Sequence, residues 1–121
     1  MMNKSKTFSE LIVWQKAHQL TLNIYKMTEN FPKKETYGLT SQMRRAVVSI
    51  PANIAEGYRK RGKQDKARFF NMSQGSLEEL KYYLILAKDL NYIKENNLEE
   101  LTIEVGKLLN AYMKAILTSN S

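Results

Sequence analysis

The sequence contains no cysteine, one histidine and two prolines in 121 residues. The missing cysteines exclude disulfides, thiolate metal ligands and cysteine nucleophiles, and they suit a reducing cytoplasm. His18 has Gln15 three residues before it, so the Glu-x-x-His pairs of di-iron helical bundles are missing. There is also no Walker-type or Gly-x-Gly-x-x-Gly phosphate loop. These absences predict that the protein is not an enzyme and needs no metal or cofactor.

Long apolar runs are missing as well. The first apolar run, Leu11–Trp14, ends at Gln15, which makes it too short for the core of a signal peptide. Nothing approaches the ~20 apolar residues that a membrane span requires. We therefore expect a cytoplasmic protein with no membrane-spanning segment.

Basic residues are in excess, and they are unevenly distributed. The formal net charge is +7, and the segment Arg59–Arg68 holds six basic residues and one acid. Such a block raises the local concentration of phosphate-bearing partners. The alternative interpretation is a solvated segment that only keeps the protein soluble.

Helical periodicity runs through the whole sequence. Apolar residues recur at steps of three and four in four segments, at about residues 8–31, 37–58, 64–90 and 98–117. Short links between long helices favour antiparallel neighbours. We therefore predict a single all-α domain over residues 1–121, folded as an antiparallel up-and-down four-helix bundle.

Polar residues suggest where the helices begin. Thr7, followed by Glu10 three residues later, resembles a capping box and predicts a helix start near Phe8. Thr36 and Asn97 are candidate N-caps of the second and fourth helices.

A proline and a glycine fall inside predicted helices. Pro51 removes one helical hydrogen bond, which predicts a kink or a short break in the second helix. Gly75 lies in the middle of the third helix, where glycine is unfavourable. We expect the backbone of a neighbouring helix to approach closely there.

The second helix carries a polar stripe. Its members share one face because they are separated by three or four residues, and they are Arg45, Ser49, Asn53, Glu56 and Lys60. Buried members need hydrogen-bond partners, from the next helix or from another copy of the chain. One interpretation is that the stripe fixes helix register, and the other is that its basic residues contact phosphate.

The sequence around this stripe resembles a known family. SIPANIAEG at Ser49–Gly57, preceded by YGLTSQMRRA at Tyr37–Ala46, resembles the bacterial four-helix bundle proteins encoded in 23S rRNA intervening sequences. LIVWQKA at Leu11–Ala17 and GSLEEL at Gly75–Leu80 fit the same pattern, so the resemblance covers about residues 8–93. It implies a bundle assembled as a homopentamer. It also implies a relationship to the accessory variability determinant of diversity-generating retroelements, a basic pentamer that binds nucleic acid.

Two sets of candidate residues follow from the resemblance and from the basic segment, which supplies Lys63, Lys66 and Arg68. The structural and oligomer set is Ser49, Pro51, Asn53, Glu56 and Gly57. The nucleic-acid-binding set is Arg44, Arg45, Arg59, Lys60, Arg61, Lys63, Lys66 and Arg68. No base-reading motif is present, so we expect an oligomer that binds RNA or DNA with low sequence specificity. The alternative is a protein-interaction or scaffold subunit with no nucleic-acid role.

Overall fold

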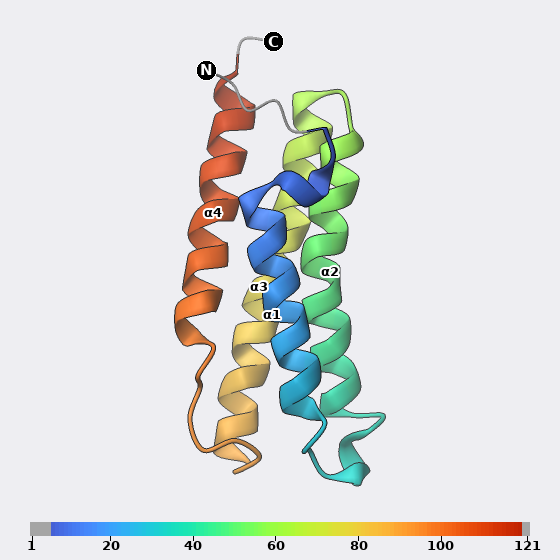
Figure 1. Cartoon of the computed structure of the whole chain (residues 1–121), viewed down its shortest axis with the longest axis vertical. Coiled ribbons are helices and arrows are strands. Elements are labelled where there is room, and N and C mark those ends of the chain that lie inside the picture. The colour runs from blue at the N-terminus through green and yellow to red at the C-terminus, as the bar shows by residue number, and fades with distance from the viewer. Residues whose placement is uncertain (1–5, 120–121) are drawn as a thin grey trace.

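Four long helices lie side by side in the computed structural model, which describes residues 6–119 (Figure 1). They are α1 (Ile12–Thr28), α2 (Leu39–Arg59), α3 (Lys63–Asp89) and α4 (Glu99–Thr118), with short 3-10 turns η1 (Phe8–Glu10) and η2 (Lys33–Glu35). The described residues contain no strand. Residues 1–5 and 120–121 of the predicted domain lie outside the described range.

Successive helices run in opposite directions (Figure 1). The start of α1, the turn between α2 and α3, and the end of α4 all lie at the same end of the bundle. α1 packs against α2 and α4, and α3 packs against the same two helices. The predicted antiparallel up-and-down four-helix bundle is therefore confirmed.

One apolar stripe from each helix forms the core. The largest fully buried side chains come from all four helices, and they are Leu20, Ile24, Met43, Ile50, Ile54, Leu77, Leu80, Leu84, Leu109, Val13, Val47 and Val105. Burying a leucine or isoleucine side chain contributes ~1.5–3 kcal/mol. The three- and four-residue spacing therefore holds the bundle together through burial.

The first helix is shorter than the predicted 8–31. Phe8–Glu10 forms a 3-10 turn, and the α-helix begins only at Ile12. The predicted capping box is wrong, because Thr7 makes no side-chain cap hydrogen bond. The carboxylate of Glu10 accepts instead from the backbone N–H of Lys6.

The N-cap positions of α2 and α4 are Gly38 and Leu98, so the predicted caps Thr36 and Asn97 are wrong. Glu35 accepts a hydrogen bond from the first backbone N–H of α2 at 3.0 Å. Thr36 has helical backbone angles and ends η2, whereas an N-cap residue needs an extended backbone. Asn96, rather than Asn97, accepts the backbone N–H of Leu98 at 3.0 Å.

Helix α2 runs unbroken through Pro51, so of the two predicted alternatives, a kink or a short break, the break is wrong. Proline has no N–H, which leaves the carbonyl of Val47 without its helical donor. The hydroxyl of Thr21 on α1 donates to that carbonyl at 3.2 Å. The hydroxyl of Ser73 on α3 donates to the carbonyl of Ile50 at 2.8 Å. Side chains of both neighbouring helices therefore donate hydrogen bonds to carbonyls of α2 near its proline.

Close packing against a glycine occurs at Gly57 and not at Gly75. A Cβ atom at Gly57 would lie 3.0 Å from the Cβ of Phe69 and 3.0 Å from the ring of Phe70. Nothing lies within 4 Å of the corresponding position at Gly75. The expectation for Gly75 is therefore wrong, and the last residue of the SIPANIAEG motif lets α2 and α3 approach.

Candidate nucleic-acid interface

Six of the eight basic candidates gather where α2 passes into α3. We call this group the basic end, and it consists of Arg59, Lys60, Arg61, Lys63, Lys66 and Arg68. The connection between the helices is only Lys60–Gly62, so the last turn of α2 lies beside the first turns of α3. The end of α4 lies at the same end of the bundle (Figure 1).

Two lysines of the basic end donate hydrogen bonds to backbone carbonyls at the C-terminal ends of helices. The ammonium of Lys66 donates to the carbonyl of Tyr58 at 2.8 Å and lies 3.4 Å from that of Gly57. Burial lowers the pKa of Lys66 from its ordinary value. Lys63 donates to the backbone carbonyl of Ser119 at the end of α4. Cations are favourable at helix C-termini, so both lysines stabilise the fold before any ligand is considered.

Two more cations flank the half-buried ring of Phe69. The ammonium of Lys60 lies 5.1 Å from the ring centroid, and the guanidinium carbon of Arg68 lies 4.6 Å from it. Lys60 also pairs with Glu56 at 3.9 Å, and Arg68 pairs with Asp65 at 3.5 Å. Exposed ion pairs of this kind contribute ~0–1 kcal/mol, so a phosphate can replace the carboxylate at little cost.

Arg59 and Arg61 are exposed, and within residues 6–119 neither side chain makes a hydrogen bond, an ion pair or a ring contact. A guanidinium group matches phosphate with two parallel hydrogen bonds. These two arginines are therefore the most available anion-binding groups of the basic end.

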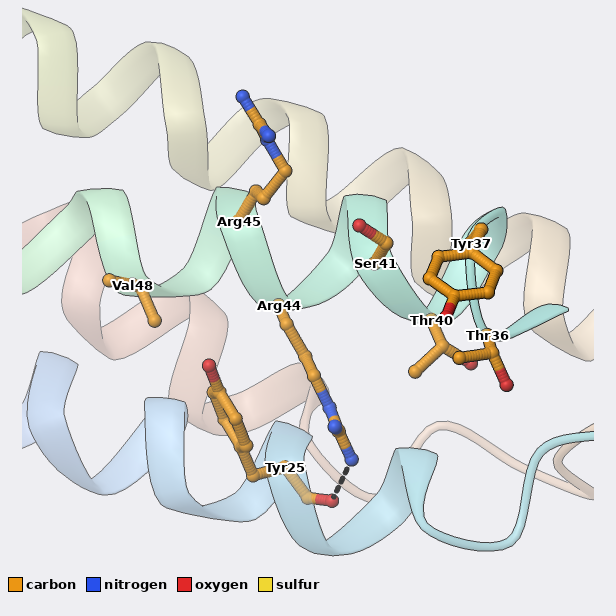
Figure 2. Close-up of a pocket in the computed structure, with 8 residues that line it drawn as sticks. All are labelled: Tyr25, Thr36, Tyr37, Thr40, Ser41, Arg44, Arg45 and Val48. Carbon is orange, nitrogen blue, oxygen red and sulfur yellow. Dashed lines mark hydrogen bonds between the residues drawn. The ribbon is translucent and has the colours of Figure 1, made fainter. Parts of the chain in front are cut away.

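The other two candidates lie elsewhere on α2. Arg45 precedes Arg59 by roughly 20 Å along the helix. Figure 2 shows Arg44 reaching toward α1, whereas Arg45 extends from the opposite side of α2. Arg44 donates from Nε to the Thr28 hydroxyl at 2.9 Å and from Nη2 to the Tyr25 carbonyl at 3.2 Å. Arg44 therefore ties α2 to the end of α1, and Arg45 alone is exposed.

A groove of about 430 Å³ runs between these arginines, bordered by Tyr25, Tyr37 and Val48 (Figure 2). The guanidinium of Arg44 lies over the Tyr25 ring, 4.6 Å from its centroid. Arg44 is hydrogen-bonded to α1, whereas Arg45 points away from α1. The two guanidinium groups therefore do not face the same phosphate in this geometry.

The polar stripe of α2 bonds to α3. The side-chain amide of Asn53 donates to the carbonyl and to the hydroxyl of Ser49, each at 2.9 Å. The Ser49 hydroxyl in turn lies 2.9 Å from that of Ser76 on α3. These contacts favour the interpretation that the motif fixes the register of α2 on α3.

The single histidine, His18, is exposed and stacks on Trp14 with ring centroids 4.9 Å apart. Residues 6–119 contain no group of three or more His, Cys, Asp or Glu side chains placed to hold a metal ion. Within the same range, no helix is both long enough and apolar enough to cross a membrane.

The sequence interpretation missed an apolar part of the basic end. A pocket of about 480 Å³ is lined by Tyr112, Ala115 and Ile116 of α4 together with Arg61, Lys63, Lys66 and Ser119. The available signal was the apolar stripe of α4, which continues through Ile116. What the sequence alone did not reveal is that this stripe ends beside the basic segment.

Fold and surface together define a small basic protein of the up-and-down four-helix bundle class. Residues 9–111 match the family model of the 23S rRNA-intervening sequence protein, and the chain belongs to that family. A protein of unknown function from the S23 ribosomal protein family of Bacteroides thetaiotaomicron VPI-5482 has a similar crystal structure, with a TM-score of 0.74 and 26% sequence identity. The match covers 85% of this chain and 99% of that chain. No curated protein sequence matches this chain.

Proposed function

We propose that the protein is a non-enzymatic homo-oligomer that binds RNA or DNA through its basic end, with little sequence preference. The observation that carries the proposal is the gathering of six cationic side chains around one helix connection, including the exposed Arg59 and Arg61. Each phosphate that such a group neutralises releases a counterion, which drives binding without reading bases.

Assembly into an oligomer increases the strength of such a surface. A modest basic patch repeated around a ring contacts several stretches of one polymer, so the overall affinity exceeds that of one subunit. The family resemblance implies a relationship to the accessory determinant of diversity-generating retroelements, and that implied relationship favours a pentamer and a nucleic-acid ligand. Sequence specificity is not expected, because no element of the described fold presents a base-reading motif.

A second candidate function is a protein-interaction or scaffold subunit. Met72, Tyr82 and Ile85 on α3 are 44%, 57% and 59% exposed, although they are large and apolar. Exposed apolar side chains on one helix suit a protein partner, including another copy of this chain. This candidate predicts assembly without salt-sensitive binding to nucleic acid.

A single titration of nucleic-acid binding against salt concentration distinguishes the two candidate functions. Binding to structured RNA and to duplex DNA is measured at several salt concentrations, with the molecular mass followed by light scattering. Replacing both Arg59 and Arg61 with Gln should reduce the magnitude of the log–log salt slope by about 2 for duplex DNA, since each phosphate contact contributes ~0.9. The mass should not change.

The matched control replaces Lys88 and Lys94 with Gln. Both lysines are exposed, and they lie at the opposite end of the bundle, so the loss of net charge is identical. The control should retain the wild-type slope. If both double variants weaken binding equally, the basic end is not the interface, and if the wild type binds neither polymer at low salt, the scaffold function takes precedence.

A further inference from the structure

The pocket beside the basic end combines two chemistries. The apolar part of its lining, which we call the floor, is Tyr112, Ala115 and Ile116 from the last turns of α4. The cationic part of its lining, which we call the rim, is Arg61, Lys63 and Lys66. Among residues 6–119, the side chains that line the pocket include no carboxylate, so the described charge around it is of one sign.

The floor is fixed before any ligand arrives. The ring of Tyr112 stacks on Phe70, with centroids 6.1 Å apart and an interplanar angle of 25°. Phe70 is itself 2% exposed, which anchors the stack in the core. Lys63 donates to the carbonyl of Ser119, just after α4, and Lys66 donates to that of Tyr58 in α2, so the rim is positioned as well. A site whose side chains are already ordered loses less entropy when it binds.

We propose that this pocket receives one unpaired base of a single-stranded nucleic acid while the surrounding cations hold the adjoining phosphates. The inference rests on the proposed function and adds the strandedness of the ligand. A nucleobase presents a flat apolar face next to an anionic backbone, which matches a pocket lined by an aromatic ring, apolar side chains and cations. The volume of about 480 Å³ lies in the range of small-ligand pockets.

The charge and the apolar lining favour a single strand over a small anion, a duplex or an acidic peptide. The positive charge continues outside the pocket through Arg59, Lys60 and Arg68, which suits a polymer with successive phosphates more than a single small carboxylate. A duplex keeps its bases stacked inside and would leave the apolar floor uncovered. An acidic peptide would match the charge but would place no flat ring on the floor.

The test compares three probes of equal length: oligothymidylate, an abasic strand with the same sugar–phosphate backbone, and a duplex. The wild type should bind oligothymidylate about tenfold more tightly than the abasic strand, as expected when one base stacks on an aromatic side chain. Ala115→Met fills the pocket and should reduce oligothymidylate binding to the abasic level. Its binding to duplex should stay the same.

The chain supplies a matched control. Ala111 is exposed on the same helix one turn earlier and does not line the pocket, and Ala115 is also exposed, so both substitutions are compatible with folding. Ala111→Met should leave all three affinities unchanged.

Three outcomes would overturn the inference. Equal, salt-dependent binding of all three probes would leave the proposed function standing and remove the base pocket. Binding that no substitution at Ala115 alters would do the same. Failure of every probe to bind at low salt, with an acidic peptide binding instead, would overturn the proposed function and the pocket together.

Discussion

The hydroxyl oxygen of Thr21 lies 3.2 Å from the carbonyl oxygen of Val47, the acceptor that loses its helical donor at Pro51. The same hydroxyl lies 2.9 Å from the carbonyl of Ala17 within α1, so one side chain serves two helices. The hydrogen bond explains how α2 crosses a proline without ending.

Removing that hydroxyl should destabilise the bundle in a way that depends on the proline. Thr21→Val keeps the side-chain shape and leaves the Val47 carbonyl without a donor, which should cost ~1–3 kcal/mol in the free energy of unfolding. In a Pro51→Ala background the missing backbone N–H returns, so the same substitution should cost less. Urea unfolding of the four proteins gives the coupling, which should exceed ~0.5 kcal/mol.

Thr21→Ser is the control, because it retains the hydroxyl and should retain most of the hydrogen bond. Equal losses from Thr21→Val in the two backgrounds would show that the hydroxyl does not replace the proline's missing donor.

Gly57 in α2 and Gly75 in α3 should respond in opposite directions to substitution by alanine. Gly57→Ala places a Cβ at 3.0 Å from the Cβ of Phe69, and overpacking of this kind costs ~1–3 kcal/mol. Gly75→Ala meets nothing within 4 Å and should stabilise α3 by up to ~1 kcal/mol through helix propensity. Thermal unfolding of both variants checks this, and destabilisation by Gly75→Ala would show that its surface is occupied by a partner.

Acid should weaken a hydrogen bond between the α1–α2 and α3–α4 connections, which lie at the end of the bundle opposite the basic end. The hydroxyl of Tyr92 donates to the carboxylate of Glu35 at 2.7 Å. The backbone N–H of Leu39 and then this hydroxyl lower the pKa of Glu35, while the same contact raises the pKa of Tyr92. The contribution of ionised Glu35 is therefore complete above its unfolded-state pKa and is lost as pH falls through the lower folded-state value.

Unfolding midpoints measured across that pH range should show the effect. Glu35→Gln should lower the midpoint at neutral pH and flatten its decline in acid. Tyr92→Phe removes one of the two donors that lower the pKa of Glu35 and should flatten the decline only in part. An acid decline that is identical in wild type and Glu35→Gln would show that other carboxylates control it.

Substitutions of Arg44 and Arg45 should differ in their effect on stability, although they change the surface charge equally. Arg44→Gln removes hydrogen bonds to Thr28 and Tyr25 and should cost about 1–2 kcal/mol, a value reduced because the site is half-exposed. Arg45→Gln should leave the unfolding midpoint nearly unchanged, since Arg45 is exposed. Unfolding curves of the two variants, which carry the same charge change, check this, and equal midpoints would contradict the assignment of Arg44 to packing.

Much of the fold could be predicted because it depends on spacing. Stripes such as Val13, Ala17, Leu20 and Ile24 specify which face of a helix is buried, and burial dominates the stability of a bundle. The helix starts were less predictable, because several polar residues near each end can act as the cap. Glu35 acts at α2 through a side chain long enough to reach past η2.

The candidate site could be predicted only as a set of charges. The sequence locates Arg59 and Lys66 in one basic segment, but it does not show that Lys66 is bonded to the end of α2 while Arg59 remains exposed. It also gives no sign that Ile116 lies beside them. Those distinctions depend on how distant helices meet, which no local pattern contains.

The three-residue connection Lys60–Gly62 also has a consequence for the route by which the chain folds. Closing a short loop costs little entropy, and α2 and α3 share an extensive contact that includes Gly57 packed on Phe69. We expect this helical hairpin to form early, with α1 and α4 joining afterwards. Core substitutions in α2 and α3 should therefore slow refolding, whereas those in α4 should mainly accelerate unfolding.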